Sequence, residues 1–253
     1  MNIEIRNLRE IESLNQRGGR TLSIVDLLRC GTLSVEMAAV AMRAIRLGAS
    51  VLTAAGPGGA GKTTLLGALL NLLPPGEPIR TVDRRSVLAD ARSRPDAEPA
   101  CYLVHEIGQG AYYGYLWGPA VAEFFALSRG RRRIAACLHA DTIDEAEEIL
   151  CASSLGVSRE DFGRLGLVLF MRADRFGRST PRRRVAAMYE SDGQGGHRLL
   201  YCLDDAGERF ERTAAARDPG GLSLYVEWLE RLVADEVIEL ADVRRRLLEF
   251  YSD

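Results

Sequence analysis

The feature that most constrains this chain is a glycine-rich stretch between an apolar strand and an apolar helix. It follows the apolar run 51–55 and reads Gly56-Pro57-Gly58-Gly59-Ala60-Gly61-Lys62-Thr63. The pattern G-x-x-x-x-G-K-[ST] is typical of a phosphate-binding loop, in which glycines let backbone N–H groups turn toward anionic oxygens. The helix that starts at the end of the loop adds the partial positive charge of its N-terminus. We therefore expect a chain that binds phosphate groups at this loop.

Lysine usage singles out the same loop. The chain has 33 basic residues, and Lys62 is the single lysine among them. An ammonium group is a compact point charge on a flexible stem, which a planar guanidinium does not replace at such a site. We predict that the loop binds a nucleoside triphosphate, ATP with Mg²⁺, with Lys62 on the β- and γ-phosphates and Thr63 on the metal. The other predicted nucleotide-binding residues are Gly56, Gly58, Gly59, Ala60, Gly61 and Thr64.

Composition sets outer bounds on the chain. With 253 residues and 47% apolar content, it can bury one large core or two small ones. No stretch approaches the roughly 20 apolar residues of a membrane span, and Met1–Arg9 lacks the pattern of a signal peptide, so we expect a cytoplasmic protein. Five cysteines without a C-x-x-C pair argue against a disulfide framework and a zinc ribbon. Cys137 and His139 would share one strand face, so they are a conceivable metal site. Further metal ligands are not clustered with them in the sequence, which argues against such a site.

Apolar periodicity predicts the order of elements. From residue 49 onward strands and helices alternate, which indicates an α/β fold with a mainly parallel sheet. Predicted strands cover 51–55, 79–83, 101–106 and 133–139, predicted helices cover 63–73 and 120–128, and a capping box at Thr142 and Glu145 opens another helix. Residues 84–99 are interpreted as a loop with room for a helical turn.

The two ends of the chain have a different pattern. The polar residues 1–22 are interpreted as a short arm, and two helices are predicted over 23–30 and 35–47. After about residue 165 the pattern indicates antiparallel strands, followed by helices over 222–234 and 242–251. We therefore divide the chain into an N-terminal arm with helices (1–48), a P-loop core (49–164) and C-terminal strands and helices packed on that core (165–253).

Three polar residues end strands that should finish at the same sheet edge as the loop. Glu106 ends an apolar strand that we expect beside the first one, where an acid faces Mg²⁺ and the attacking water, so it is the Walker B candidate. Asp83 and His139 end the two other core strands. A strand-end Asp or His also serves as a cap or loop anchor, so the pattern leaves both roles open. His105 is interpreted as structural.

The motifs in this order resemble those of the type II and type IV secretion ATPases, in particular the branch that drives tight-adherence pili and archaeal filaments. The likeness covers residues 21–190. It is carried by Thr21–Leu28, Gly31–Ala38, the P-loop with its helix, Pro74–Glu77, Thr81–Asp83 at the family's Asp box, Val104–Glu106 at Walker B, Cys137–Asp141 at the His box, and the basic strand Arg182–Glu190. Most of the family's N-terminal domain has no counterpart in residues 1–48.

The resemblance implies a RecA-like P-loop core and a hexameric ring. It further implies a motor that hydrolyses ATP to assemble pilus-like filaments or to secrete proteins, on the cytoplasmic face of a membrane that holds a polytopic inner-membrane platform protein. In that scheme Glu106 orients water bound to the metal that it shares with Thr63, Asp83 is the general base and His139 senses the γ-phosphate. Arginines supplied to a neighbouring subunit would come from Arg84, Arg85, Arg92 and Arg94.

The chain departs from the family at three positions of these motifs. Asp83 stands where the family has Glu, Arg84 where it has Asp, and His105 where it has Gly. A regulatory nucleotide-binding subunit with little turnover is therefore one alternative. A nucleic-acid motor is another, but the net charge of −2, the pI near 6.0 and the lack of interleaved aromatics around Arg131–Arg133 argue against it.

Overall fold

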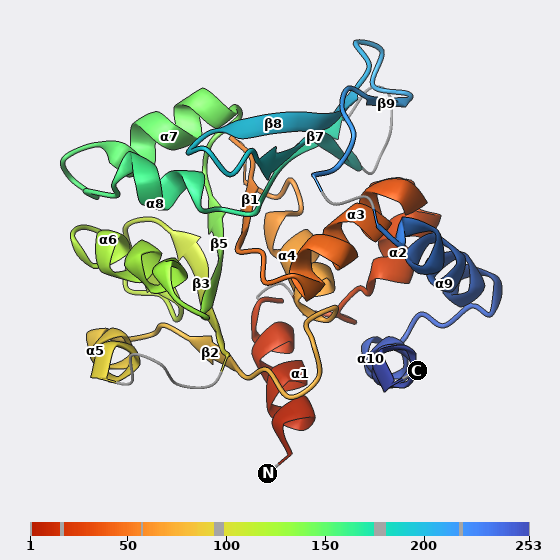
Figure 1. The fold of residues 1–253 in the computed structure, drawn as a ribbon, viewed down its shortest axis with the longest axis horizontal. Helices are drawn as coiled ribbons and strands as arrows, with labels where there is room; N and C mark the ends of the chain where they lie inside the picture. Colours follow the sequence, from red (N-terminus) through yellow and green to blue (C-terminus); the bar gives the residue numbers. More distant parts are fainter. Residues whose placement is uncertain are drawn as a thin grey trace.

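One sheet organises the whole chain (Figure 1). The computed structural model describes residues 2–15, 18–56, 58–93, 99–174, 181–217 and 220–252. Within them lies a nine-stranded sheet in the order β2-β3-β5-β1-β6-β7-β8-β9, with β4 paired to β3 off this path. Strands β1 to β6 pair in parallel, and β7, β8 and β9 continue the sheet in antiparallel fashion. The predicted α/β class with a mainly parallel sheet and a C-terminal β-plus-helix extension is confirmed.

The strands lie close to where the apolar pattern puts them. Their bounds are β1 Val51–Ala54, β2 Ile79–Thr81, β3 Cys101–Ile107, β4 Tyr115–Leu116, β5 Arg133–Leu138, β6 Leu167–Asp174, β7 Arg182–Ser191, β8 His197–Leu203 and β9 Phe210–Arg212. β1, β3 and β5 are buried along their whole length, as expected for central strands that helices cover on both faces.

Helices cover the two faces of the sheet. Their bounds are α1 Ile3–Ser13, α2 Ile24–Arg29, α3 Val35–Arg46, α4 Lys62–Leu70, α5 Arg85–Ser93, α6 Ala120–Phe125, α7 Ile143–Cys151, α8 Arg159–Gly163, α9 Leu222–Ala234 and α10 Leu240–Ser252, with a 3₁₀ turn at Ala126–Arg129. No helix of the described ranges is long and apolar enough to cross a membrane.

Alternate residues of the central strands build two separate cores. Cys101 and Leu103 of β3 face a core with α1 to α4, α9 and α10, whereas Tyr102 and Val104 face a core with α5 to α8. This alternation is the period of two that any strand imposes on its side chains. The division of the chain at residues 48 and 164 stays a prediction, because the sheet runs without a break from the predicted core (49–164) into the predicted C-terminal part (165–253).

Two segments interpreted as irregular are helical. The expected arm contains α1, whose Ile11 is 1% exposed in the first core, and the expected loop 84–99 contains α5, whose Leu88 is fully buried. Both helices are polar overall, with apolar residues on one narrow face only. Burial of that face, rather than a long apolar stripe, holds each of them on the sheet.

The expected neighbour of the first strand is also different. β5 lies between β1 and β3, so the strand that ends in Glu106 does not pair with β1. The prediction that the Walker B strand lies beside the first strand is wrong. Periodicity identifies strands but carries no information about which strand a given one pairs with.

A buried ion pair anchors the amino-terminal end of β5. Arg133 Nε and Nη2 donate to Glu77 Oε1 and Oε2 at 2.6 and 2.7 Å, and both side chains are under a tenth exposed. Arg133 also donates to the carbonyl oxygen of Ile45 at the end of α3. The pair thus connects the segment before β2, strand β5 and the end of α3.

Removing one member of this pair leaves a buried, unpaired charge. Glu77→Ala is expected to lower the free energy of unfolding by about 3–5 kcal/mol, because the Arg133 guanidinium keeps its desolvation cost without its partner. Glu147→Ala, which breaks the exposed pair with Arg159, is the matched control and should cost less than about 1 kcal/mol. Urea denaturation of the two variants measures both values, and equal losses would contradict a buried anchor.

Candidate nucleotide site

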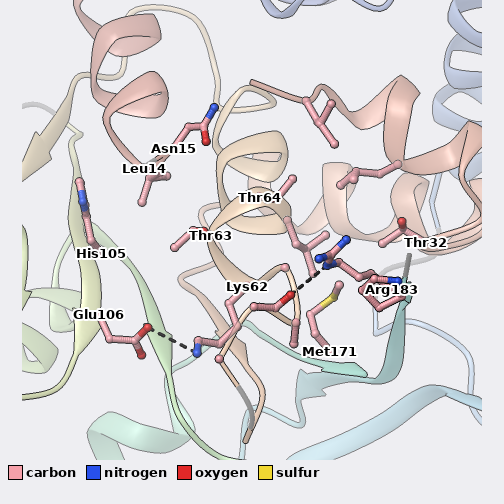
Figure 2. Close-up of a pocket in the computed structure, with 18 of the residues that line it drawn as sticks. Leu14, Asn15, Thr32, Lys62, Thr63, Thr64, His105, Glu106, Met171 and Arg183 are labelled. Atoms are coloured by element: carbon pink, nitrogen blue, oxygen red, sulfur yellow. Dashed lines mark hydrogen bonds and ion pairs between the residues drawn. The ribbon is translucent and has the colours of Figure 1, made fainter. Parts of the chain in front are cut away.

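The carboxyl ends of β1, β3 and β5 surround a cavity of about 660 Å³ (Figure 2). Its volume is typical of a small-molecule site. Its lining includes the P-loop residues Gly58–Leu65 together with His105, Glu106, Tyr115 and His139. The remaining lining residues are Leu14, Asn15, Leu22, Leu27, Cys30, Thr32, Met171 and Pro181–Arg183. Pro57 of the predicted loop lies outside the described residues.

The loop is shaped as an anion cradle. α4 begins at Lys62, and its N-cap Gly61 has φ 101°, a left-handed conformation that favours glycine. A β-carbon at Gly61 would also press on Met171 and Arg183 at 3.2 to 3.3 Å. The N–H groups of the first helical turn, from Lys62 to Thr64, have no partner within a helix. They are therefore available to phosphate oxygens, as the motif predicts.

Lys62 is held by side chains from two neighbouring strands. Its side chain is only 7% exposed, and Nζ lies 3.4 Å from Glu106 Oε2 (Figure 2). Nζ also lies 3.2 Å from His139 Nε2. A buried ammonium is costly unless it is paired, and Glu106 supplies the opposite charge. The structure thus brings together three predicted site residues, from α4, β3 and the end of β5.

His139 connects the loop to this lysine. Its Nδ1 lies 2.8 Å from the carbonyl oxygen of Gly56, which can only accept, so Nδ1 carries a proton and donates it. In the neutral ring Nε2 is then the acceptor, and it faces the Lys62 ammonium. His139 therefore fixes the start of the loop and the position of Lys62 together.

Asp141 is a site residue that the sequence reasoning did not single out. The N–H of Gly56 donates to Asp141 Oδ1 at 2.6 Å, and a β-carbon at position 56 would collide with the same carboxylate. The N–H of Asp141 in turn donates to Glu145 Oε2 at 2.7 Å. Its presence in the run that matches the His box was the available signal. Gly56 is thus held through its C=O by His139 and through its N–H by Asp141.

Glu106 has one occupied and one unoccupied carboxylate oxygen. Oε2 pairs with Lys62, while Oε1 is buried without a hydrogen-bond partner among the described residues. Burial raises the pKa of Glu106, and the Lys62 charge opposes the rise, as does His139 when its ring is protonated. A buried carboxylate oxygen without a partner suits a water, a hydroxyl or a metal ion as ligand.

The residues present fit Mg²⁺ bound through phosphates. In the described part of the chain, no group of three or more His, Cys, Asp and Glu could hold a metal by itself. Mg²⁺ commonly takes one or two carboxylates, waters and the oxygens of a bound phosphate chain. Thr63 and the free oxygen of Glu106 supply such a partial set.

Cys137 is buried with Sγ 3.3 Å from Thr53 Oγ1, inside the sheet.

Asp83 is not brought to this cavity. It is exposed just beyond the end of β2, is absent from the cavity lining, and its carboxylate lies 3.7 Å from Arg84 Nε. Of the three predicted catalytic residues, the structure therefore gathers Glu106 and His139 around Lys62 and leaves Asp83 apart.

His105 lies at the cavity wall in a dry environment. Ser13 Oγ donates its hydrogen to the carbonyl of Glu10 at 2.6 Å, so it can only accept from His105 Nε2 at 3.4 Å. Nε2 therefore carries the proton, and Nδ1 is buried without a partner among the described residues. The ring stands edge-on to Tyr113 and leaves no room for a β-carbon at Gly114. Burial lowers the pKa of His105 from 6.5 to about 4.

The lowered pKa makes His105 a source of acid sensitivity. Because the unfolded chain protonates His105 near pH 6.5 and the folded chain only near 4, unfolding takes up a proton between these values. Its contribution to stability is complete above pH 6.5 and falls by about 3 kcal/mol as the pH drops toward 4. His105→Gln should remove this slope. Urea denaturation at pH 7, 5.5 and 4.5 measures it, and parallel pH profiles of wild type and variant would contradict the assignment.

No protein-family model matches the sequence, and no curated protein is significantly similar to it. Among solved structures the chain is similar to the VirB11 ATPase of the Brucella suis type IV secretion system in complex with sulphate, with a TM-score of 0.46 and 18% identity over 66% of this chain and 55% of that one. It is also similar to the Legionella pneumophila ATPase DotB, with a TM-score of 0.40 and 14% identity over 82% of this chain and 62% of that one.

The two likenesses are partial. The chain spans 55% and 62% of the lengths of these two structures.

Proposed function

We propose that this chain is an ATP-binding and ATP-hydrolysing motor protein of the secretion ATPase superfamily. The observation that carries the proposal is the placement of the single lysine. Lys62 stands at the N-terminus of α4, behind a glycine loop, within 3.4 Å of the strand-end carboxylate of Glu106. Loop, helix end, ammonium and acid are the parts from which phosphoryl-transfer sites are assembled.

The cavity lining suits both parts of a nucleotide. The N–H groups of Gly58–Thr64 and the Lys62 ammonium would hold the phosphates, and Thr63 would bind Mg²⁺. The apolar side chains of Leu22 and Leu27 in the same lining would cover the base. When bound, Mg²⁺ neutralises charge on the β- and γ-phosphates.

Glu106 is the residue we assign to the hydrolytic step. As the phosphates attract Lys62, the ammonium leaves Glu106, and the carboxylate loses its partner in a buried site. It can then orient a water molecule through either oxygen and accept its proton. His139 holds Gly56 in place, and its Nε2 contacts Lys62. A movement of Lys62 toward a bound γ-phosphate would break this contact, and His139 would sense the γ-phosphate in this way.

The Lys62 assignment predicts a loss of binding without a loss of fold. Lys62→Ala should weaken ATP affinity at least about 100-fold, because the phosphate charge loses its only point-charge partner, and Lys62→Arg should not restore it. Isothermal calorimetry measures the affinities. Arg198→Ala on β8, remote from the cavity, is the control and should bind as wild type does. Unchanged binding by Lys62→Ala would rule out the P-loop assignment.

The carboxylate assignment predicts a difference between two acids. Glu106→Gln should lower kcat by about 10²- to 10⁴-fold, since the group acts mainly in the transition state. ATP affinity should not fall, because the variant removes a negative charge that competes with the phosphates for Lys62. Asp83→Asn should leave kcat unchanged, because Asp83 lies outside the cavity lining.

Steady-state phosphate release from wild type and both variants provides the measurement. A slow Asp83→Asn variant whose rate is recovered in Asp83→Glu would restore Asp83 as the general base. If single-turnover hydrolysis by the wild type is absent, the regulatory subunit with little turnover is the better description. His105 in place of the family's Gly favours that second function.

The cellular role follows from the resemblance of the motifs. We propose a homo-oligomer, a hexameric ring, that works on a polytopic inner-membrane platform protein at the cytoplasmic face of the membrane to assemble filaments or secrete proteins. Arg84 and Arg85 are exposed near the start of α5, and Arg92 donates to Glu123 at 2.6 Å, so the first two are the better placed to reach a neighbouring subunit. Arg94 lies outside the described residues.

A further inference from the structure

We propose that Arg183 is a second cationic residue of the phosphate site, which holds the P-loop in its binding shape and contacts a polyphosphate ligand. This inference rests on the proposed function, because it concerns the same cavity. Arg183 lies 121 positions after Lys62 in sequence and on a different part of the sheet, near the start of the antiparallel strand β7. It lines the cavity together with the loop.

Contacts with two loop residues place the side chain. Arg183 Nε donates to the carbonyl oxygen of Gly59 at 2.9 Å, a bond drawn in Figure 2. Its Cδ lies 3.2 Å from where a β-carbon of Gly61 would be. The arginine stem therefore lies against the loop, and the guanidinium is at the cavity.

The bond to Gly59 fixes the direction of a neighbouring N–H group. In a trans peptide the carbonyl oxygen and the following N–H lie in one plane and point in opposite directions. Because Arg183 holds the Gly59 oxygen, the N–H of Ala60 points away from Arg183 within that plane. Arg183 thus fixes the orientation of this peptide of the loop.

The partners of its two neighbours explain why Arg183 has the role, although Arg182 also lines the cavity. Arg182 pairs with Glu208 at 3.0 Å, and Arg184 is buried, donating to the carbonyl oxygens of Gly207 and Glu208. Among the described residues, no carboxylate pairs with Arg183.

The charge balance of the cavity calls for this cation. Lys62 is already paired with Glu106, and Asp141 places a second carboxylate on Gly56. A polyphosphate would therefore enter a site whose loop charges nearly cancel. Arg183 supplies charge without a carboxylate partner, and its planar fork matches two phosphate oxygens. The ligand class is a polyanion with adjacent phosphates, with or without a base.

Binding of two probes by the full chain tests this role. Tripolyphosphate carries the phosphates without a base, and ATP carries both. Arg183→Gln should weaken both ligands by the same factor, about 10-fold, as expected for one charge-assisted hydrogen bond. It should also reduce the dependence of affinity on salt, which a merely structural residue would not change. Arg183→Lys should recover part of the loss, and Arg198→Gln is the charge-matched control.

The outcomes separate this inference from the proposed function. Failure of the wild type to bind either ligand would contradict the proposed function itself. If the wild type binds both and Arg183→Gln binds them equally well, only the role of Arg183 is overturned. Loss of ATP affinity alone, with tripolyphosphate unchanged, would place Arg183 at the base and also overturn it. If Arg183→Gln folds poorly, Arg183→Lys, which keeps the charge, decides. A salt dependence equal to that of the wild type with a weaker affinity supports the role, and an unchanged affinity for both ligands overturns it.

Discussion

The burial of one ammonium group at the start of α4 is the constraint on which the site depends. Lys62 lies almost fully out of solvent, so its charge requires an opposite charge close by. Glu106 can meet that requirement only if β3 ends at the same sheet edge as β1. The pairing of this lysine and this acid therefore links the phosphate-binding loop to the order of the parallel strands.

Strand order then decides what each residue can reach. Neighbouring strands lie about 4.8 Å apart, so Glu106, two strands from β1, is near enough for a long lysine side chain. The strand between them, β5, ends beside the loop, and its last residues contact the loop backbone. His139 and Asp141 hold Gly56 there. Asp83 follows β2, three strands or roughly 14 Å from β1, which is too far for a short carboxylate.

The loop, its helix and the central strands could be predicted because their signals are local. Gly61 and Lys62 lie in one motif, and runs such as 101–106 are apolar throughout. The contacts of Asp141 and Arg183 could not be predicted, because they depend on which strands are neighbours. Helix α1 could not be predicted for a related reason: its few buried residues stabilise the helix only by packing on the sheet that they cover. The strand-end pattern puts Asp83 at the correct sheet edge but carries no information on its distance from β1 along that edge.

The single lysine also allows the most direct test. A sample labelled with ¹⁵N-lysine has one backbone amide signal from this residue type, that of Lys62, so it needs no assignment. Titration with Mg-ATP should shift this signal and saturate near one equivalent per chain. Titration with adenosine, which has no phosphates, should leave it nearly unchanged. A Lys62 signal that stays in place at millimolar Mg-ATP would contradict nucleotide binding at this loop.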